Sequence, residues 1–305
     1  MDQKANAVIE QHIVPTKVMR QRLSDYCCGL FAALPSRKGV KKAIKAGRIL
    51  VDGKLGFTGD WVVPDQLIQL LADERENTKV YESQLPVCFE NDYFAIINKP
   101  SGVPVSGNQF KTIANMLAFN LTKSPKVDAL ANPYPLHRLD APTSGLLLIA
   151  KTARAQLKLG ALFAERKIQK TYQAIVCGQT PAKGSIDLPI DGKPALSHYR
   201  LIKSGPSIKN ETLSWLELGL ETGRTHQLRI HLASIGYPIM GDQLYGTEGR
   251  IYRGKGLFLC ATSLSFINPW TEEPFQLQIS PPSKFEKLME REARMHARYH
   301  TNRES

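Results

Sequence analysis

The stretch from Pro135 to Lys151, with the sequence PLHRLDAPTSGLLLIAK, most constrains the fold of this chain. Its last part, Leu146 to Ala150, is an unbroken apolar run with the length of a strand that is buried on both faces. The preceding residues, Ala141 to Gly145, suit a turn, because Pro fixes one φ angle and Gly frees another. The sequence therefore predicts that Asp140 lies in a loop held against a core strand.

A carboxylate at this position has two interpretations. An Asp before a turn of Pro, Ser and Gly commonly caps the backbone N–H groups of that turn. Alternatively, Asp140 is a nucleophile or a general base held on a rigid support. The local pattern alone favours the capping role.

The charge of the chain narrows the class of partner. The 305 residues carry a formal net charge of +12, which favours a polyanionic partner, with nucleic acid the first choice and an anionic membrane surface the second. None of the five cysteines forms a C-x-x-C pair, so the sequence supports neither a disulfide framework nor a zinc site, and we expect no metal.

The distribution of apolar residues bears on location. No apolar run approaches the roughly 20 residues of a transmembrane helix. The N-terminal segment lacks the apolar region of a secretory signal. We therefore expect a cytoplasmic protein.

The N-terminal quarter of the chain predicts a small helix–helix–hairpin module over residues 15–75. Residues 1–14 show no clear period, and we expect them to be loosely held. Apolar residues recur at threes and fours from Met19 to Leu34, which predicts a first helix. Ser36 is a suitable N-cap for a second helix that Gly47 ends.

The predicted second helix is strongly basic on one face. Its apolar residues share one face, and its cations occupy another face and both ends of the helix: Arg37, Lys38, Lys41, Lys42, Lys45 and Arg48. Clustered cations repel one another and favour contact with phosphates. The alternative is an ordinary solvated basic face.

Residues 15–75 resemble the alpha-L RNA-binding domain first seen in a small-subunit ribosomal protein. The resemblance rests on Arg22-Leu23, on Ser36-Arg37, on the run GRILVDGK from Gly47 to Lys54 and on Gly59-Asp60. Asp52 is a departure, since Asn is usual there. The resemblance implies that this module binds RNA.

The remainder of the chain predicts a second, larger domain. A polar segment at 76–84 indicates a linker, and residues 85–285 alternate between predicted strands and helices. The spacing of Leu228, Leu232 and Ile235 predicts one of these helices, which Thr225 can cap and Gly236 ends. Residues 286–305 form a charged C-terminal tail that is either a helix or disordered.

Residues 85–285 resemble the catalytic domain of the RluA family of RNA pseudouridine synthases. Four blocks carry the resemblance in order: INKPSGVPV (97–105), HRLDAPTSGLLLIAK (137–151), KTYQAIVCG (170–178) and TGRTHQLRIHLASIGYPIMGDQLYG (222–246). The resemblance implies an α+β fold with a mixed, mostly antiparallel sheet flanked by helices and loops. It also implies an isomerase that needs no cofactor.

The resemblance assigns roles to individual residues. Asp140 is implied as the nucleophile, with Arg229 as its partner and Arg224 as a second candidate. A nucleophilic carboxylate must be ionised, and a paired arginine favours that form. Tyr172 is implied to stack on the target base. The expected RNA-contact residues of this domain are Arg138, which fills the gap left by a flipped-out uridine, and Lys99, Arg224, His226 and Gln227.

Several alternatives stay open. Lys99, His226 and Gln227 either touch RNA or hold the shape of the site, and Arg229 without the resemblance is an ordinary surface arginine on a helix. The domain pairing favours large-subunit ribosomal RNA as the substrate, with transfer RNA second. A non-catalytic ribosome-assembly factor and a general RNA chaperone are rival functions. We expect a monomer.

Overall fold

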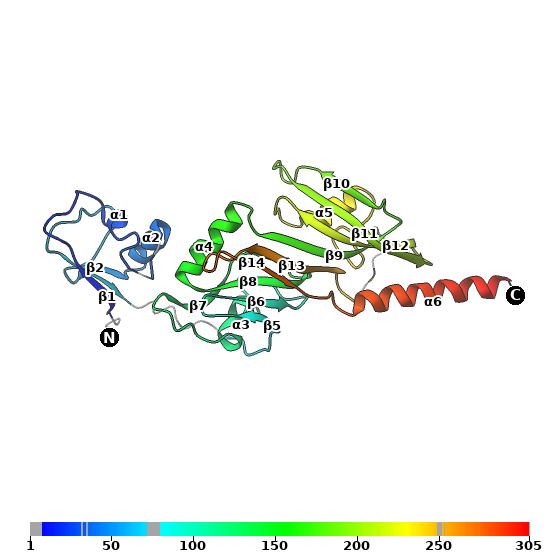
Figure 1. Cartoon of the computed structure of the whole chain (residues 1–305), viewed down its shortest axis with the longest axis horizontal. Coiled ribbons are helices and arrows are strands. Elements are labelled where there is room, and N and C mark those ends of the chain that lie inside the picture. Colours follow the sequence, from blue (N-terminus) through cyan, green and yellow to red (C-terminus); the bar gives the residue numbers. More distant parts are fainter. Residues whose placement is uncertain are drawn as a thin grey trace.

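Two β-sheets organise the part of the chain that the structure describes. The computed structural model describes residues 8–31, 33–34, 36–71, 80–248, 252 and 254–304. A four-stranded sheet has the order β1-β4-β2-β3, and a ten-stranded sheet has the order β10-β11-β12-β9-β13-β8-β6-β5, with β14 paired to β13 and β7 to β8 (Figure 1). The predicted α+β fold is confirmed.

The small sheet and two helices form the N-terminal module. Its elements are β1 (Val8–Ile13), α1 (Leu23–Tyr26), α2 (Arg37–Lys45), β2 (Ile49–Val51), β3 (Lys54–Leu55) and β4 (Leu67–Leu71). The module has its own hydrophobic core, which includes Leu23, Phe31, Val40, Ile44 and Ile68. Helix α2 has the predicted ends, because the Ser36 side chain accepts from the Gly39 N–H at 3.2 Å and Gly47 has a φ of +70°.

The predicted helix from Met19 to Leu34 is wrong, because α1 ends after four residues. Two backbone features prevent a longer helix. Arg22 forms a β-bridge with Trp61, and Gly29 has a left-handed φ of +76°. The spacing at threes and fours correctly marked buried side chains such as Leu23 and Phe31, but Leu23 lies in α1 and Phe31 lies beyond the turn that follows it.

Residues 8–13 also differ from the expectation of a loosely held segment, since they form β1 and pair antiparallel with β4. An edge strand is held by backbone hydrogen bonds, and most of its side chains here are exposed, so it needs no regular apolar pattern. Residues 1–7 lie outside the described residues. Residues 76–79 of the predicted linker also lie outside the described residues.

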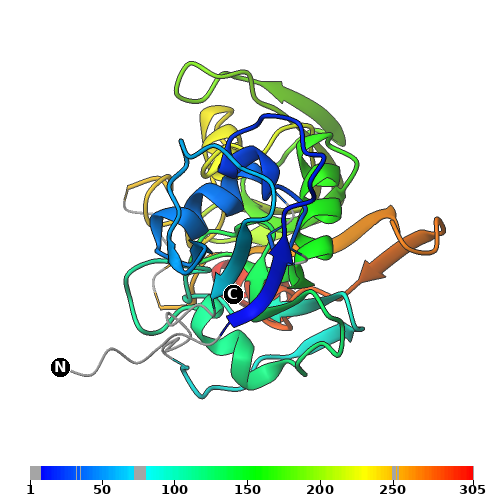
Figure 2. The same cartoon turned by 90° about the vertical axis from the view of Figure 1, so that its left-hand side faces the viewer.

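The large sheet supports the second domain. Its strands are β5 (Val87–Glu90), β6 (Phe94–Lys99), β7 (Ala129–Pro135), β8 (Ser144–Thr152), β9 (Gln169–Cys177), β10 (Lys183–Asp187), β11 (Leu196–Ser207), β12 (Glu211–Leu220), β13 (Leu259–Ile267) and β14 (Pro274–Gln278). The β13–β8 pair is parallel, and the other pairs described in this sheet are antiparallel. The β13–β14 hairpin projects from one side of the domain (Figure 2).

Strand β8 is the centre of this domain and confirms the predicted buried run, since all nine of its residues are buried. Gly145 makes its approach to β13 possible. Gly145 has a φ of +114°, and a Cβ placed there would lie 2.2 Å from the carbonyl oxygen of Ala261. The turn that follows Asp140 is thereby fixed against β13.

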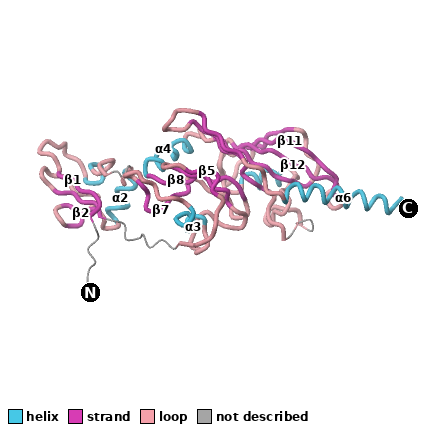
Figure 3. The backbone as a smooth tube through the Cα atoms, turned by 60° about the horizontal axis from the view of Figure 1, so that its bottom comes forward, coloured by secondary structure: helices cyan, strands magenta, loops and turns pink. Residues whose placement is uncertain are grey.

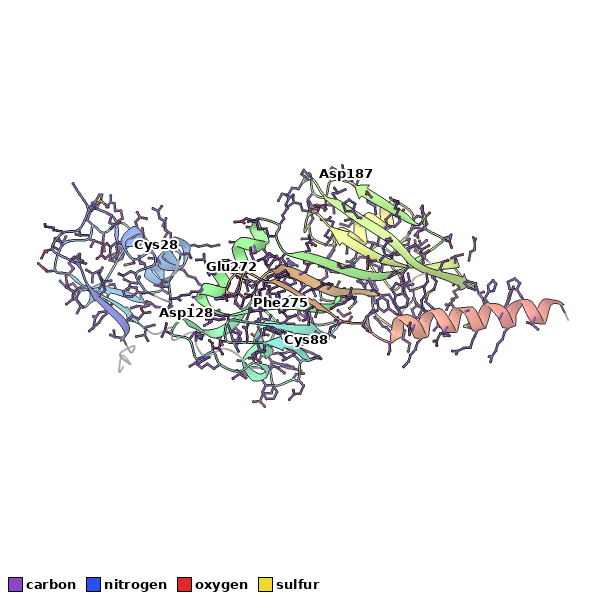
Figure 4. The ribbon with its side chains drawn as sticks, in the orientation of Figure 1. Cys28, Cys88, Asp128, Asp187, Glu272 and Phe275 are labelled. Atoms are coloured by element: carbon purple, nitrogen blue, oxygen red, sulfur yellow. The ribbon has the colours of Figure 1, made fainter. Side chains whose placement is uncertain are left out.

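The two faces of the sheet bury separate cores. Residues of β6 and β8 alternate between them, because successive side chains of a strand point to opposite faces. One core contains an aromatic cluster in which Phe94 contacts Phe89, Phe266 and Phe275. Figure 4 labels Phe275, which this cluster receives from β14.

Among the described residues, the helices that accompany this sheet are α3 (Ile113–Asn120), α4 (Ala153–Ala164), α5 (Gln227–Ser234) and α6 (Lys284–Glu304). Helix α6 begins against the core, where Phe285 packs on Trp215 and Phe258, and then projects away from the sheet (Figure 3). Of the two interpretations of the C-terminal tail, the helix is confirmed. Among the described helices, none is long and apolar enough to cross a membrane.

Candidate active site

Asp140 lies in the loop between β7 and β8 with its side chain 15 % exposed. Its neighbour Leu139 is buried in the core, so the loop is anchored on one side of the carboxylate. Arg229 Nη1 lies 3.5 Å from Asp140 Oδ2, and His226 Nε2 lies 3.8 Å from Oδ1. Within the described residues, no backbone N–H donates to this carboxylate, which argues against the capping interpretation.

His137 holds the start of this loop. The Leu148 N–H donates to His137 Nε2 at 3.0 Å, which ties the loop to strand β8. Burial and, to a smaller extent, the charge of Lys170 lower the pKa of His137 to about 3. The imidazole is therefore neutral and able to accept this hydrogen bond.

Lys99 holds the end of the loop. Its side chain is 0 % exposed, and Nζ donates to the carbonyl oxygens of Pro100, Val103 and Ala141 at 2.9, 2.7 and 3.1 Å. Burial lowers the pKa of Lys99 to about 8, although the charge of Asp140 acts to raise it. Of the two interpretations of Lys99, these contacts favour holding the shape of the site.

Arg229 is buried, 4 % exposed, so the interpretation as an ordinary surface arginine is wrong. Its Nε and Nη2 both donate to the carboxylate of Asp242 at 2.8 Å, which leaves Nη1 directed to Asp140. Asp242 is itself fixed, because its Oδ1 accepts from the N–H groups of Leu244 and Tyr245. The Arg229 guanidinium is thus locked by one carboxylate and presented to another.

The pKa values of this pair follow from opposing effects. Burial raises the pKa of Asp242, but hydrogen bonds from Arg229 and from two backbone N–H groups outweigh it, and the pKa lies below its ordinary value. Burial lowers the pKa of Arg229, but Asp242 and Asp140 outweigh it, and the pKa is raised. Both groups are therefore charged at neutral pH.

Asp242 was not predicted as a site residue. It lies in the block that resembles the family, but no spacing rule connects it to Arg229. The Tyr245 ring was missed for the same reason: it lies 5.1 Å from the Arg229 guanidinium, and its hydroxyl is 3.0 Å from His226 Nδ1. The sequence marks Asp242 only by the preceding Gly241, which indicates a turn.

The start of α5 differs from the prediction that Thr225 caps it. His226 occupies the N-cap with a left-handed φ of +56° and no side-chain cap bond. Gln227 closes this turn instead: its Oε1 accepts from Thr222 Oγ1 and the Arg224 N–H, and its Nε2 donates to Leu196 and Ser197. Gln227 is buried, so of its two interpretations these contacts favour the one in which it holds the shape of the site rather than touching RNA.

Tyr172 lies on β9, between Leu218 of β12 and Ala261 of β13. Its ring is buried and lines the same pocket as Asp140. Burial raises the pKa of the Tyr172 hydroxyl, and the charge of Asp140 raises it further. The phenol is therefore neutral at physiological pH.

A pocket of about 720 Å³ brings the predicted residues of this domain together, apart from Lys99. Five cations and two carboxylates line it: Arg138, Arg166, Lys170, Arg224 and Arg229 against Asp140 and Glu221. Arg138 is exposed, whereas Arg224 donates from Nε to Pro194 and forms no ion pair with Asp140 among the described residues. Of the two candidate partners of Asp140, the structure places Arg229 beside it.

The predicted cations of α2 lie apart from this pocket, on the N-terminal module. Lys38, Lys41, Lys42 and Lys45 are exposed and border a shallow pocket of about 430 Å³, while Arg37 pairs with Asp25 at 2.6 Å. Arg48 donates from Nε to the Leu71 carbonyl at 3.0 Å. In the described ranges, no group of three or more His, Cys, Asp and Glu side chains is arranged to hold a metal ion.

The fold and this site define a class of protein: an α+β enzyme with a carboxylate and a locked arginine in a cationic pocket. The family described as RNA pseudouridylate synthase matches residues 93–234. Curated relatives named ribosomal large subunit pseudouridine synthase D include one from Xanthomonas campestris pv. campestris, 30 % identical, with 92 % of each chain covered. Another, from Haemophilus influenzae, is 30 % identical over 90 % of this chain and 92 % of the relative.

Solved structures agree with these relatives. The human RNA pseudouridylate synthase domain containing 1 has a TM-score of 0.55 and 25 % identity, and the match covers 65 % of this chain and 84 % of that one. The human domain containing 4 has a TM-score of 0.53 at 23 % identity, over 66 % of this chain and 90 % of that one, and supports the fold. This chain belongs to the RNA pseudouridylate synthase family and is an isomerase, as the RluA resemblance predicted.

Proposed function

We propose that this enzyme converts specific uridines of large-subunit ribosomal RNA to pseudouridine, with Asp140 as the nucleophile. The observation that carries the role of Asp140 is its position in the cationic pocket, 3.5 Å from an arginine that Asp242 holds in place. The relatives named for the ribosomal large subunit support the choice of RNA.

The residues of the pocket suit the chemistry of this reaction. Isomerisation breaks the bond from N1 of uracil to the ribose, turns the base and forms a bond from C5. C5 loses a proton and N1 gains one, so the step requires no net oxidation or reduction. Asp140 supplies a carboxylate that adds to the ribose or to the base, and the bond it forms breaks again when the product is released. The Arg229 guanidinium favours the charged form of Asp140 before the addition and after this release.

Tyr172 and Arg138 have complementary roles in this proposal. The neutral, buried Tyr172 ring offers a face on which the target base stacks. A uridine in structured RNA must leave its helix to reach it, which costs a few kcal/mol. Arg138 is exposed beside Asp140, so its side chain is free to fill the space that the uridine leaves.

The N-terminal module acts in this proposal as an alpha-L RNA-binding domain, with α2 as its docking helix. Four lysines of α2 are exposed together, and cations gathered in this way attract phosphates. The buried Val40, Ala43 and Ile44 orient this face outward.

Reversal of two of these charges tests the docking role. The double variant Lys41→Glu with Lys42→Glu should weaken RNA binding and lower the slope of log affinity against log salt by about 1.5, since two phosphate contacts are lost. Fluorescence anisotropy with a large-subunit RNA transcript measures both quantities. The matched control, Lys209→Glu with Lys287→Glu, changes two exposed lysines of the other domain. Equal weakening by both pairs would contradict a specific role for α2.

Nucleotide-resolution pseudouridine mapping tests the proposed function itself. Total RNA from cells without the protein is compared with RNA from cells rescued by wild type or by Asp140→Ala. We expect one or a few large-subunit positions to be lost and restored by wild type alone. Loss of transfer-RNA positions would move the substrate to transfer RNA. An unchanged map, with both proteins still bound to ribosomal particles, would favour an assembly factor.

A further inference from the structure

Trp61 of the N-terminal module is 42 % exposed. It lies between two arginines that do not belong to the docking helix α2. The guanidinium carbons of Arg20 and Arg22 lie 4.5 and 3.8 Å from the centroid of its ring. A guanidinium this close to an indole is attracted to its π system. The other two tryptophans are engaged in the second domain, because Trp215 is 5 % exposed and Trp270 stacks on Tyr93.

The charges of this patch, which comprises Arg20, Arg22 and Trp61, are not neutralised. Arg20 and Arg22 are both exposed, and neither has a carboxylate within 4.0 Å among the described residues. Arg22 donates to the Gly59 carbonyl, whereas Arg20 has no hydrogen-bond partner in the described part of the chain. The indole therefore orders two exposed guanidiniums whose charges are available to a ligand.

The patch is built into the module. The Leu23 N–H donates to the Asp60 carbonyl at 2.8 Å, and the Val62 N–H donates to the Gln21 carbonyl at 3.1 Å. These bonds join the segment that carries the two arginines to the segment that carries Trp61. The relative position of ring and cations is thus set by backbone pairing.

We propose that the Arg20–Trp61–Arg22 patch binds unpaired RNA, with guanidinium donors on phosphates and a guanidinium plane, backed by the indole, against a base. The proposal rests on the proposed function, because it adds a second contact on the same RNA. Single strands expose base faces that stack on aromatic rings, whereas a duplex keeps them covered. A protein partner is less suitable, since it would desolvate two cations that have no carboxylate beside them.

The patch adjoins the docking helix. Arg22 directly precedes α1, and Asp25 of α1 pairs with Arg37, the first residue of α2. Arg22 precedes Asp25 by three residues, which in a helix corresponds to a rise of about 4.5 Å. An RNA strand that leaves the lysines of α2 at this end therefore meets the patch next.

The test uses the full-length protein and a fluorescein-labelled oligouridine of about 12 nucleotides, beside a duplex of the same length. Arg20→Glu should weaken single-strand binding by about tenfold or more and duplex binding by clearly less. Lys287→Glu makes the same charge change at an exposed residue of α6 and should stay within about twofold. Because Arg20 forms no hydrogen bond with any residue that the structure describes, the variant should keep the wild-type circular dichroism.

Tryptophan fluorescence reports on the ring itself. Neutral acrylamide should quench the exposed Trp61 in the free protein, and saturating oligouridine should protect it. Equal quenching with and without RNA would overturn the proposal, as would equal weakening by Arg20→Glu and Lys287→Glu. Full RNA affinity in Arg20→Glu would also overturn it and leave a protein as the occupant.

Pseudouridine formation by the same preparations separates this proposal from the proposed function. If the patch is not a contact, wild type still forms pseudouridine and Arg20→Glu matches its RNA affinity. If the proposed function is wrong, wild type forms none, whatever the patch binds.

Discussion

Asp140→Ala should form no detectable pseudouridine and still bind RNA within about tenfold of wild type, or about 1.4 kcal/mol. The activity is lost because the variant has no group that can add to the ribose or base. The affinity is kept because phosphate contacts by cations dominate RNA binding, and the cations around the pocket remain. Release of tritium from C5 of labelled uridine measures the activity, and anisotropy measures the affinity.

A second acid of the same pocket provides the control. Glu221 also lines the pocket, but it is exposed and lies 3.5 Å from His198, so Glu221→Gln should keep most of the activity. Asp140→Asn should be as inactive as Asp140→Ala, because an amide is not a nucleophile of this kind. If Asp140→Ala lost RNA binding as well, Asp140 would be structural.

The residues around Asp140 show which features of the site can be predicted from the sequence. The buried strand after it was predictable, because a continuous apolar run specifies burial without any knowledge of its partners. That Asp140 and Arg229 meet was implied by resemblance alone: they are 89 residues apart, and no periodicity connects a loop to a distant helix. Asp242 was missed because its role is defined by that same long-range contact.

The N-terminal module shows a different limit. Spacing at threes and fours predicted a long helix from Met19, yet α1 has only four residues, and buried residues such as Phe31 lie beyond it. The pattern reports which side chains are buried, and a positive φ at Gly29 decides the path between them. Strand β1 was missed because backbone hydrogen bonds to β4 hold it, and such bonds require no regular pattern of apolar residues.

Asp242→Ala should destabilise the fold by about 3–5 kcal/mol, because it leaves the Arg229 guanidinium buried without its bidentate partner. The side chains concerned are 4 % and 0 % exposed and are joined by two bonds of 2.8 Å. The variant also removes the acceptor for the Leu244 and Tyr245 N–H groups. Urea unfolding measures the loss, and the remaining folded enzyme should be less active because Nη1 is no longer held toward Asp140.

The pH dependence of the unfolding free energy separates the contribution of the Asp242 charge from that of its hydrogen bonds. The pKa of Asp242 is lower in the folded chain than in the unfolded chain, so its contribution is present above the unfolded pKa of about 3.9 and is lost as the pH falls through the folded value. Asp242→Asn keeps the shape and removes the proton equilibrium. Its unfolding free energy should therefore fall less steeply with acid than that of wild type.

An exposed ion pair with the same shortest contact distance, but with one hydrogen bond in place of two, provides the comparison. Arg200 Nη2 lies 2.8 Å from Glu217 Oε1, but the two side chains are 63 % and 37 % exposed. Exposed pairs contribute about 0–1 kcal/mol, so Glu217→Ala should change the unfolding free energy by no more than that. Removal of the carboxylate should therefore cost much more unfolding free energy at Asp242 than at Glu217, because burial decides whether water can replace the lost partner. Equal effects at Asp242 and Glu217 would mean that water reaches the Arg229 guanidinium, and Asp242 could not then be what holds it toward Asp140.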